Sequence, residues 1–148
     1  MLNRIIVANI FIFLLLMLNS CQTDPEPIHY GSDACSMCKM IIVDTHFGSE
    51  LISSKGKIYK FDSIECLVRY LKKNDASNTY NNRLLVTDHS RPNTFVEAQS
   101  ASYLHSEKLP SPMGESLSAF ESKDSLQAYF NRFGGEQLSW EDVRVRVK

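Results

Sequence analysis

The sequence predicts an α+β fold in which two strand–strand–helix–strand halves form one small domain. Two observations predict this fold. Short β-rich segments alternate with amphipathic helical segments, and Tyr59 to Leu71 aligns without a gap with Ser118 to Phe130. A third, the composition, allows it: 148 residues with 43% hydrophobic content are enough for one compact core.

The alignment of the two segments indicates an internal duplication. Five aligned pairs are identical or chemically similar: Phe61 with Phe120, Asp62 with Glu121, Ser63 with Ser122, Leu67 with Leu126 and Tyr70 with Tyr129. Two amphipathic helices can align by chance, but here the strand-to-helix junction matches as well. We therefore expect two half-repeats, over about residues 40–88 and 94–146.

The first half contains three predicted strands, one helix and a fourth strand. The strands are "MIIVDTHF" (40–47), "ELISS" and "KIYKF", with a turn at "SSKG", and "RLLVTD" follows the helix. "FDSIECLVRYLKKN" is the predicted helix, because Ile64, Leu67, Val68 and Leu71 recur at helical spacing. Asp62 or Ser63 can cap it.

The second half contains two predicted strands, a helix and a last strand, which matches the first half from "ELISS" onward. "ASYLHSE" and "ESLSAF" are predicted strands, and the aligned helix ends at Gly134-Gly135. The last predicted strand is "EQLSWEDVRV".

The N-terminal segment has the pattern of a bacterial lipoprotein signal peptide. Arg4 precedes an apolar run from Ile5 to Leu18, which is shorter than the roughly 20 residues that span a bilayer. "LNSC" then resembles a lipobox, so we expect a signal peptide over 1–20, lipidation at Cys21 and a tether over 21–34. The alternative is a transmembrane anchor. Gln22 after the cysteine favours the outer membrane, facing the periplasm.

The stretch "DACSMCKM" places Cys35, Met37, Cys38 and Met40 within eight residues. Thiolates and thioethers are soft ligands and together favour Cu(I). Zinc seldom uses thioethers, and no second C-x-x-C is present for a zinc ribbon. Lys39 stands where a haem attachment site has histidine. The pattern therefore indicates a Cu(I) site.

Two alternatives remain for the C-x-x-C pair. One is a structural disulfide between Cys35 and Cys38, and the other is a redox-active dithiol. A redox dithiol normally lies where a strand meets a helix, whereas "CSMCKM" continues into a β-rich segment.

Two further sulfur residues are candidates for the site. Met113 lies in the loop "LPSPMGES", either as a ligand or folded over the edge of the core. Cys66 lies off the apolar stripe of its helix and aligns with Ser125, so it is either a boundary cysteine or a third thiol ligand. Spacing selects none of His46, His89 and His105.

The chain resembles the NosL family of copper-binding lipoproteins. The resemblance runs from Cys35 to about Val143 and rests on the lipobox, "CSMCKM" in the place of C-x-x-C-G-M, "FD" before the helix, "LLVTD", "PMG" and "FGGEQL". It implies two strand–strand–helix–strand halves in a domain over 35–148, with a fold related to the core of organomercurial lyase.

The resemblance also implies a function. Such proteins hold Cu(I) in the periplasm and deliver it to the copper cluster of nitrous oxide reductase, so we expect a metallochaperone and not an enzyme. Its expected partners are copper, a client copper enzyme, a membrane transporter and the membrane itself. Carried over by position, the ligands are Cys38, Met40, Met113 and Cys35, with Cys66 and Met37 as additional candidates.

The chain departs from the family pattern at two residues, and other functions remain open. Lys39 replaces a glycine, and Cys66 is an additional thiol. The alternative function is a lipid-anchored thiol–disulfide oxidoreductase that uses the C-x-x-C pair. A nucleic-acid partner is not expected, because the net charge is −1 and no basic run is present.

Overall fold

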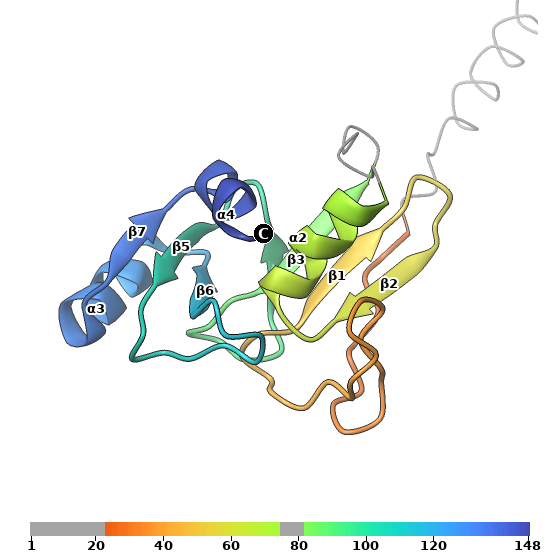
Figure 1. The fold of residues 1–148 in the computed structure, drawn as a ribbon, viewed down its shortest axis with the longest axis horizontal. Coiled ribbons are helices and arrows are strands. Elements are labelled where there is room, and N and C mark those ends of the chain that lie inside the picture. The colour runs from red at the N-terminus through yellow and green to blue at the C-terminus, as the bar shows by residue number, and fades with distance from the viewer. Residues whose placement is uncertain (1–22, 75–81) are drawn as a thin grey trace, which may run out of the picture.

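A computed structural model describes residues 23–74 and 82–148. Within these residues the chain forms two antiparallel sheets, each with a helix packed on it, and a short third helix between them (Figure 1). The elements are β1 (Ser49–Ile52), β2 (Ile58–Phe61), α2 (Ile64–Lys73), β3 (Arg83–Thr87), β4 (Phe95–Glu97), β5 (Ser102–His105), β6 (Leu117–Phe120), α3 (Lys123–Phe133), β7 (Glu136–Leu138) and α4 (Trp140–Arg146).

The two sheets have the same internal order. The first runs β2-β1-β3-β4 and the second runs β6-β5-β7, so in both cases the first strand of the half is central. The registers match too, since Ser49 pairs with Phe61 in the first half and Ser102 with Phe120 in the second. A parallel bridge between Asp88 and Ala119 joins the sheets. The predicted α+β fold class is confirmed.

Helix α2 begins and ends where the sequence predicts. Ser63 is its N-cap and accepts a hydrogen bond from the Cys66 N–H, while Lys72 and Lys73 lie in the last turn, where positive charge is favourable. Helix α3 begins in the same way with Ser122 and ends at Phe133, before Gly134. Gly135 has to be a glycine, because a Cβ there would lie 2.1 Å from the His105 carbonyl oxygen.

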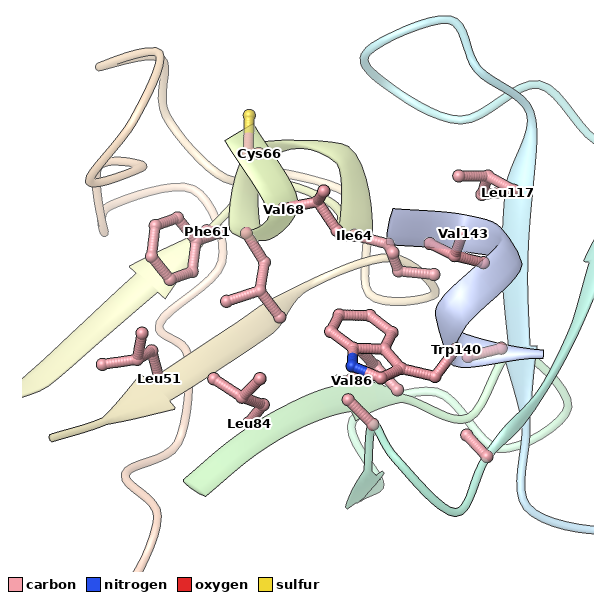
Figure 2. Close-up of a cluster of buried hydrophobic side chains, with 14 of the residues drawn as sticks. Leu51, Phe61, Ile64, Cys66, Val68, Leu84, Val86, Leu117, Trp140 and Val143 are labelled. Carbon is pink, nitrogen blue, oxygen red and sulfur yellow. The ribbon is translucent and has the colours of Figure 1, made fainter. Parts of the chain in front are cut away.

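The main core lies between α2, the first sheet and α4 (Figure 2). The predicted apolar stripe of α2 is buried, and Ile64 approaches Trp140 and Val143 of α4. A smaller cluster of Leu104, Phe120 and Leu126 supports α3. The main core is therefore shared between the halves, since Tyr103, Leu117 and Trp140 of the second half belong to it. Burial of this apolar surface is the largest favourable contribution to folding.

The described part of the predicted tether, residues 23–34, belongs to the folded domain. The Lys60 ammonium donates to the Pro27 carbonyl at 2.8 Å, Glu26 N–H donates to the Glu50 carboxylate at 3.3 Å, and Ile28 is buried. This segment covers the face of the first sheet that lies opposite α2. The predicted signal peptide and Cys21 lie outside the described residues.

Three sequence predictions about individual elements are corrected. Residues 40–47 form an irregular loop with a turn at 45–47 instead of a strand, and Ile41 makes only an isolated bridge with Ala34 of the same loop. Strand β4 was not predicted. The segment 136–145, predicted as one strand, holds β7 and then α4, because the Ser139–Asp142 capping box starts a helix.

One end of the first sheet gathers several loops. Strands β2 and β3 end where β1 begins, because both are antiparallel to β1. The loop before β1, the start of α2 and the residues after β3 therefore meet there. Within the described residues, none of the helices has the length and apolar character needed to cross a membrane.

Candidate metal centre

The first turn of α2 provides one of three clustered thiols. The Cys66 side chain lies on the outer side of α2 (Figure 2), off the apolar stripe as its spacing predicts, although it belongs to the buried residues of the main core. It is nevertheless fully buried. Its burial comes from loops that cover the outer side of α2, so Cys66 is not the boundary cysteine that the sequence allowed.

The C-x-x-C loop provides the other two thiols and is closed by backbone hydrogen bonds. Cys35 N–H donates to the Met40 carbonyl at 2.8 Å, and Lys39 N–H donates to the Cys35 carbonyl at 3.0 Å. Ser36 N–H donates to the Lys60 carbonyl at 2.8 Å, which fastens the loop to β2. These bonds fix the direction in which the two cysteines project.

Lys39 adopts a left-handed backbone conformation, with φ of 69°. Glycine adopts this conformation without the steric cost of a Cβ, whereas other L-residues pay roughly 1–2 kcal/mol. The glycine that the family pattern has at this position is therefore explained by the turn. The Lys39 ammonium donates a hydrogen bond to the Ser36 carbonyl at 2.8 Å, so the long side chain lies against its own loop.

The sulfur atoms of Cys35, Cys38 and Cys66 all lie within 4.8 Å of one another. All three are free thiols; Cys35 and Cys66 are fully buried, and Cys38 is half-buried. Two segments about thirty positions apart in the chain thus converge on one point, with one sulfur reachable from outside. Soft ligands in this arrangement can hold a soft cation.

The three thiols differ in acidity. The hydrogen bond from the Cys66 thiol lowers the pKa of Cys35 to about 4, with further support from the N–H groups of Cys38, Asp62 and Met37. The same bond raises the pKa of Cys66, and burial raises the pKa of Cys38. The cluster therefore presents one thiolate, and a metal ion would displace protons from the other two.

Two buried carboxyl groups, which the sequence analysis did not single out, lie beside the thiols. Burial raises the pKa of Asp62 to about 6, and the charges of Cys35 and Glu65 add to this rise. Glu65 is fully buried, and its carboxylate accepts a hydrogen bond from the Ser111 hydroxyl. In the sequence, these two carboxyl groups were recognisable only as a possible helix cap and as an acidic residue of the first helical turn. The negative charge of Asp62, which repels that of the Cys35 thiolate, favours a cation in the cluster.

The methionine candidates occupy three different positions. Met113 is half-buried against the main core, in a loop tied to α2 by the Ser111–Glu65 hydrogen bond and a 3.2 Å Arg69–Glu115 ion pair. Met37 is also half-buried. The Met40 side chain is 49% exposed, although its N–H hydrogen-bonds the Cys38 sulfur. The structure thus brings together the three cysteines, while the methionine ligands remain predictions.

The comparison with known families agrees with this arrangement. The NosL family matches residues 28–147, which is most of the chain. The chain belongs to the NosL family. The matched region includes the C-x-x-C loop, α2 and the Met113 loop. All the segments around the thiols therefore lie within the part of the chain that matches the family.

A solved structure has the same fold. It is described as the copper chaperone NosL from Shewanella denitrificans, with a TM-score of 0.67 and 23% sequence identity over 82% of this chain and 96% of that chain. No curated protein sequence matches. The likeness confirms the NosL fold, while the relation to organomercurial lyase and the duplication itself remain predictions.

Proposed function

We propose that this NosL-family protein is a Cu(I) carrier, not an enzyme, that holds the ion at Cys35, Cys38 and Cys66. The observation that carries the proposal is the convergence of three thiol sulfurs within 4.8 Å. Among the described residues, no histidine or carboxylate joins this group. Zinc usually takes four ligands, whereas Cu(I) is satisfied by two or three soft ones.

The transfer of copper would proceed by ligand exchange. Cys38 is the least buried of the three thiols, so an incoming sulfur or nitrogen from a partner reaches the ion from its side. Met113 would add a neutral, weak thioether ligand to the three thiols and would be the first ligand to leave. The two buried thiols keep the ion bound until the partner has added its own ligand.

The client is a copper enzyme of the periplasm, and nitrous oxide reductase is the client that the family resemblance implies. The relative of known structure is described as a copper chaperone, which supports a carrier role. Lipidation at Cys21 would confine the protein to the outer membrane, facing the periplasm. Confinement to one surface raises its effective concentration near a membrane transporter or client.

The test is an anaerobic Cu(I) titration of the reduced protein against a chromogenic chelator, with a Zn²⁺ titration in parallel. We expect one tightly bound Cu(I) per chain and weaker zinc binding. Cys38→Ser should abolish competition with the chelator, and Met113→Leu should weaken it. A wild-type protein that cannot compete for Cu(I) would refute the proposal.

The thiol–disulfide oxidoreductase has one supporting observation, the lowered pKa of Cys35. The same thiol is fully buried, which blocks in-line attack on a substrate disulfide. A turnover assay with a dithiol and a disulfide substrate separates the two functions. The carrier shows no turnover above that of a Cys35→Ser variant.

A further inference from the structure

Two histidines lie side by side at the end of the first sheet where β1 begins. His46 precedes β1 and His89 follows β3, and their ring centroids are 5.1 Å apart with an interplanar angle of 46°. A metal ion binds imidazole nitrogen at about 2.0–2.1 Å, so two rings that share one ion have centroids about 5–6 Å apart. The pair already has this spacing.

His89 is a buried imidazole with an unused nitrogen. It is 8% exposed and stacks against Phe47, Phe120 and Tyr129 at 5.0, 5.8 and 5.4 Å between ring centroids. Its Nδ1 has no hydrogen-bond partner among the described residues. An aromatic core position would be filled as well by phenylalanine, and an unpartnered buried nitrogen costs about 1–3 kcal/mol. Packing alone therefore does not account for a histidine here.

His89 is also kept in the form that binds metal. Burial, with a smaller contribution from His46, lowers the pKa of His89 to about 4. The ring is neutral at pH 7 and can offer a lone pair without first losing a proton.

His46 is oriented by a carboxylate. Asp44 accepts hydrogen bonds at 2.9 Å both from the His46 backbone N–H and at the Nδ1 atom of the ring. Metal-binding histidines commonly have such a partner on one nitrogen, because it fixes the tautomer and leaves the other nitrogen free to bind. In this arrangement Nε2 of His46 carries the free lone pair.

We propose that His46 and His89 form a second copper site, with two imidazole ligands, separate from the three thiols. Imidazole is a good copper ligand. Ring centroids 5.1 Å apart fit a bent N–Cu–N arrangement, in which a third ligand from solvent or a partner completes the coordination of Cu(I). The antiparallel strands bring both histidines to the same end of the sheet as Cys66, which follows β2. If the proposed carrier function holds, this weaker site would receive copper before or after the thiols; its metal binding does not depend on that function.

The test uses full-length protein in which Cys35, Cys38 and Cys66 are replaced by serine and the histidines carry ¹⁵N. Cu(I) is added anaerobically, and because it is diamagnetic the imidazole ¹⁵N signals report ligation directly. We expect the signals of His46 and His89 to shift together, reaching a plateau at one equivalent. His89→Phe preserves the aromatic packing, and His46→Asn preserves a polar side chain in the exposed loop before β1. Each variant should weaken Cu(I) binding at least tenfold.

The control is His105→Asn, a histidine on β5 that should leave the binding unchanged. If neither ring shifts, or if only one does, the second site does not exist. Should the triple variant fail to fold, wild-type protein receives two equivalents in sequence. When the thiols take up the first equivalent, we expect the histidine signals to move only with the second. Histidine signals that move together with thiol loading by the first equivalent would make them ligands of the thiol site and overturn the proposal.

These outcomes are separable from failure of the proposed function. Wild-type protein whose thiols do not bind Cu(I) refutes the carrier, whatever the histidines do. Histidines that do not respond refute only the second site.

Discussion

Helices α2 and α3 occupy equivalent places in the two halves but are buried differently. Both follow a buried phenylalanine and a serine N-cap, and both bury the leucine that aligns, Leu67 or Leu126. On α3 Leu126 is the sole residue that is buried, whereas α2 buries residues on two sides. The difference lies in what covers the outer side of the helix.

Two loops cover the outer side of α2, and Cys66 lies under them. The C-x-x-C loop is fastened to β2, and the loop with Met113 is tied to α2 through Ser111 and Glu65. The aligned residue on α3 is Ser125, which is half-buried. The comparison teaches that the thiol cluster belongs to one of two similar helix-on-sheet units, and the other unit folds without it.

The largest expected effect on metal binding comes from exchanging the aligned residues Cys66 and Ser125. Cys66→Ser removes one of three thiols and should weaken Cu(I) binding by about 100-fold or more, equivalent to roughly 2.7 kcal/mol. A chelator competition assay measures this change. The reciprocal Ser125→Cys adds a thiol to α3 and should bind no second ion, since no cysteine loop faces it. If Cys66→Ser binds copper like wild type, Cys66 is not a ligand.

Truncating the aligned leucines measures how strongly each helix is packed. Large-to-small changes in a core cost about 2–5 kcal/mol, with the higher costs where the cavity cannot collapse. Leu67→Ala should lower the free energy of unfolding by about 4 kcal/mol and Leu126→Ala by about 2 kcal/mol. Chemical denaturation provides both values, and equal losses would contradict the difference in burial.

The central strands β1 and β5 differ in how their buried polar residues make stability depend on pH. Glu50 of β1 and Tyr103 of β5 occupy equivalent places in their strands, and both are fully buried. The Tyr103 hydroxyl donates to the Ala98 carbonyl, but one Glu50 oxygen has no hydrogen-bond partner among the described residues. Burial raises the pKa of Glu50 to about 7. Between pH 4.5 and 7 the folded state binds this proton more strongly than the unfolded state does, so its stabilising contribution is lost as pH rises.

Glu50→Gln removes this loss. The free energy of unfolding of the variant, relative to that of wild type, should therefore be about 3 kcal/mol more favourable at pH 8 than at pH 4.5. His89, with its pKa lowered to about 4, has the opposite slope between pH 4 and 6.5, which is why the variant must be compared with wild type at each pH. A difference that does not change with pH would show that Glu50 ionises normally.

The smallest expected effect is at Lys39. Lys39→Gly relieves the left-handed backbone and should stabilise the protein by about 0.5–1 kcal/mol, because part of the gain is offset by the greater freedom of glycine in the unfolded chain. Thermal denaturation of the apo protein measures this. A destabilised variant would mean that the Lys39–Ser36 hydrogen bond contributes more than the strain costs.

Much of the fold was predictable, because local signals and long-range packing agree there. Ser63 and Ser122 cap helices that their apolar spacing also predicts, and Gly134 ends α3. The prediction failed where the two disagree. Residues 40–47 have the composition of a strand but pair only at Ile41. Around Trp140 the apolar residues suggested a strand, whereas the Ser139–Asp142 capping box starts a helix there.

The site was predictable only in part. The sulfur-rich loop indicated a soft metal, but the burial of Cys66 depends on loops that lie far from it in the sequence. Its own helix pattern indicated only that it faces away from the core. Likewise, His46 and His89 meet because β1 and β3 are paired, which no spacing between them in the sequence reveals.

The central claim is that one Cu(I) is held by the three converging thiols. X-ray absorption at the copper edge, on protein loaded anaerobically with one equivalent, tests it most directly. We expect a first shell of sulfur alone, which loses a sulfur in Cys66→Ser. A first shell dominated by nitrogen or oxygen, or a shell that Cys66→Ser leaves unchanged, would contradict the claim.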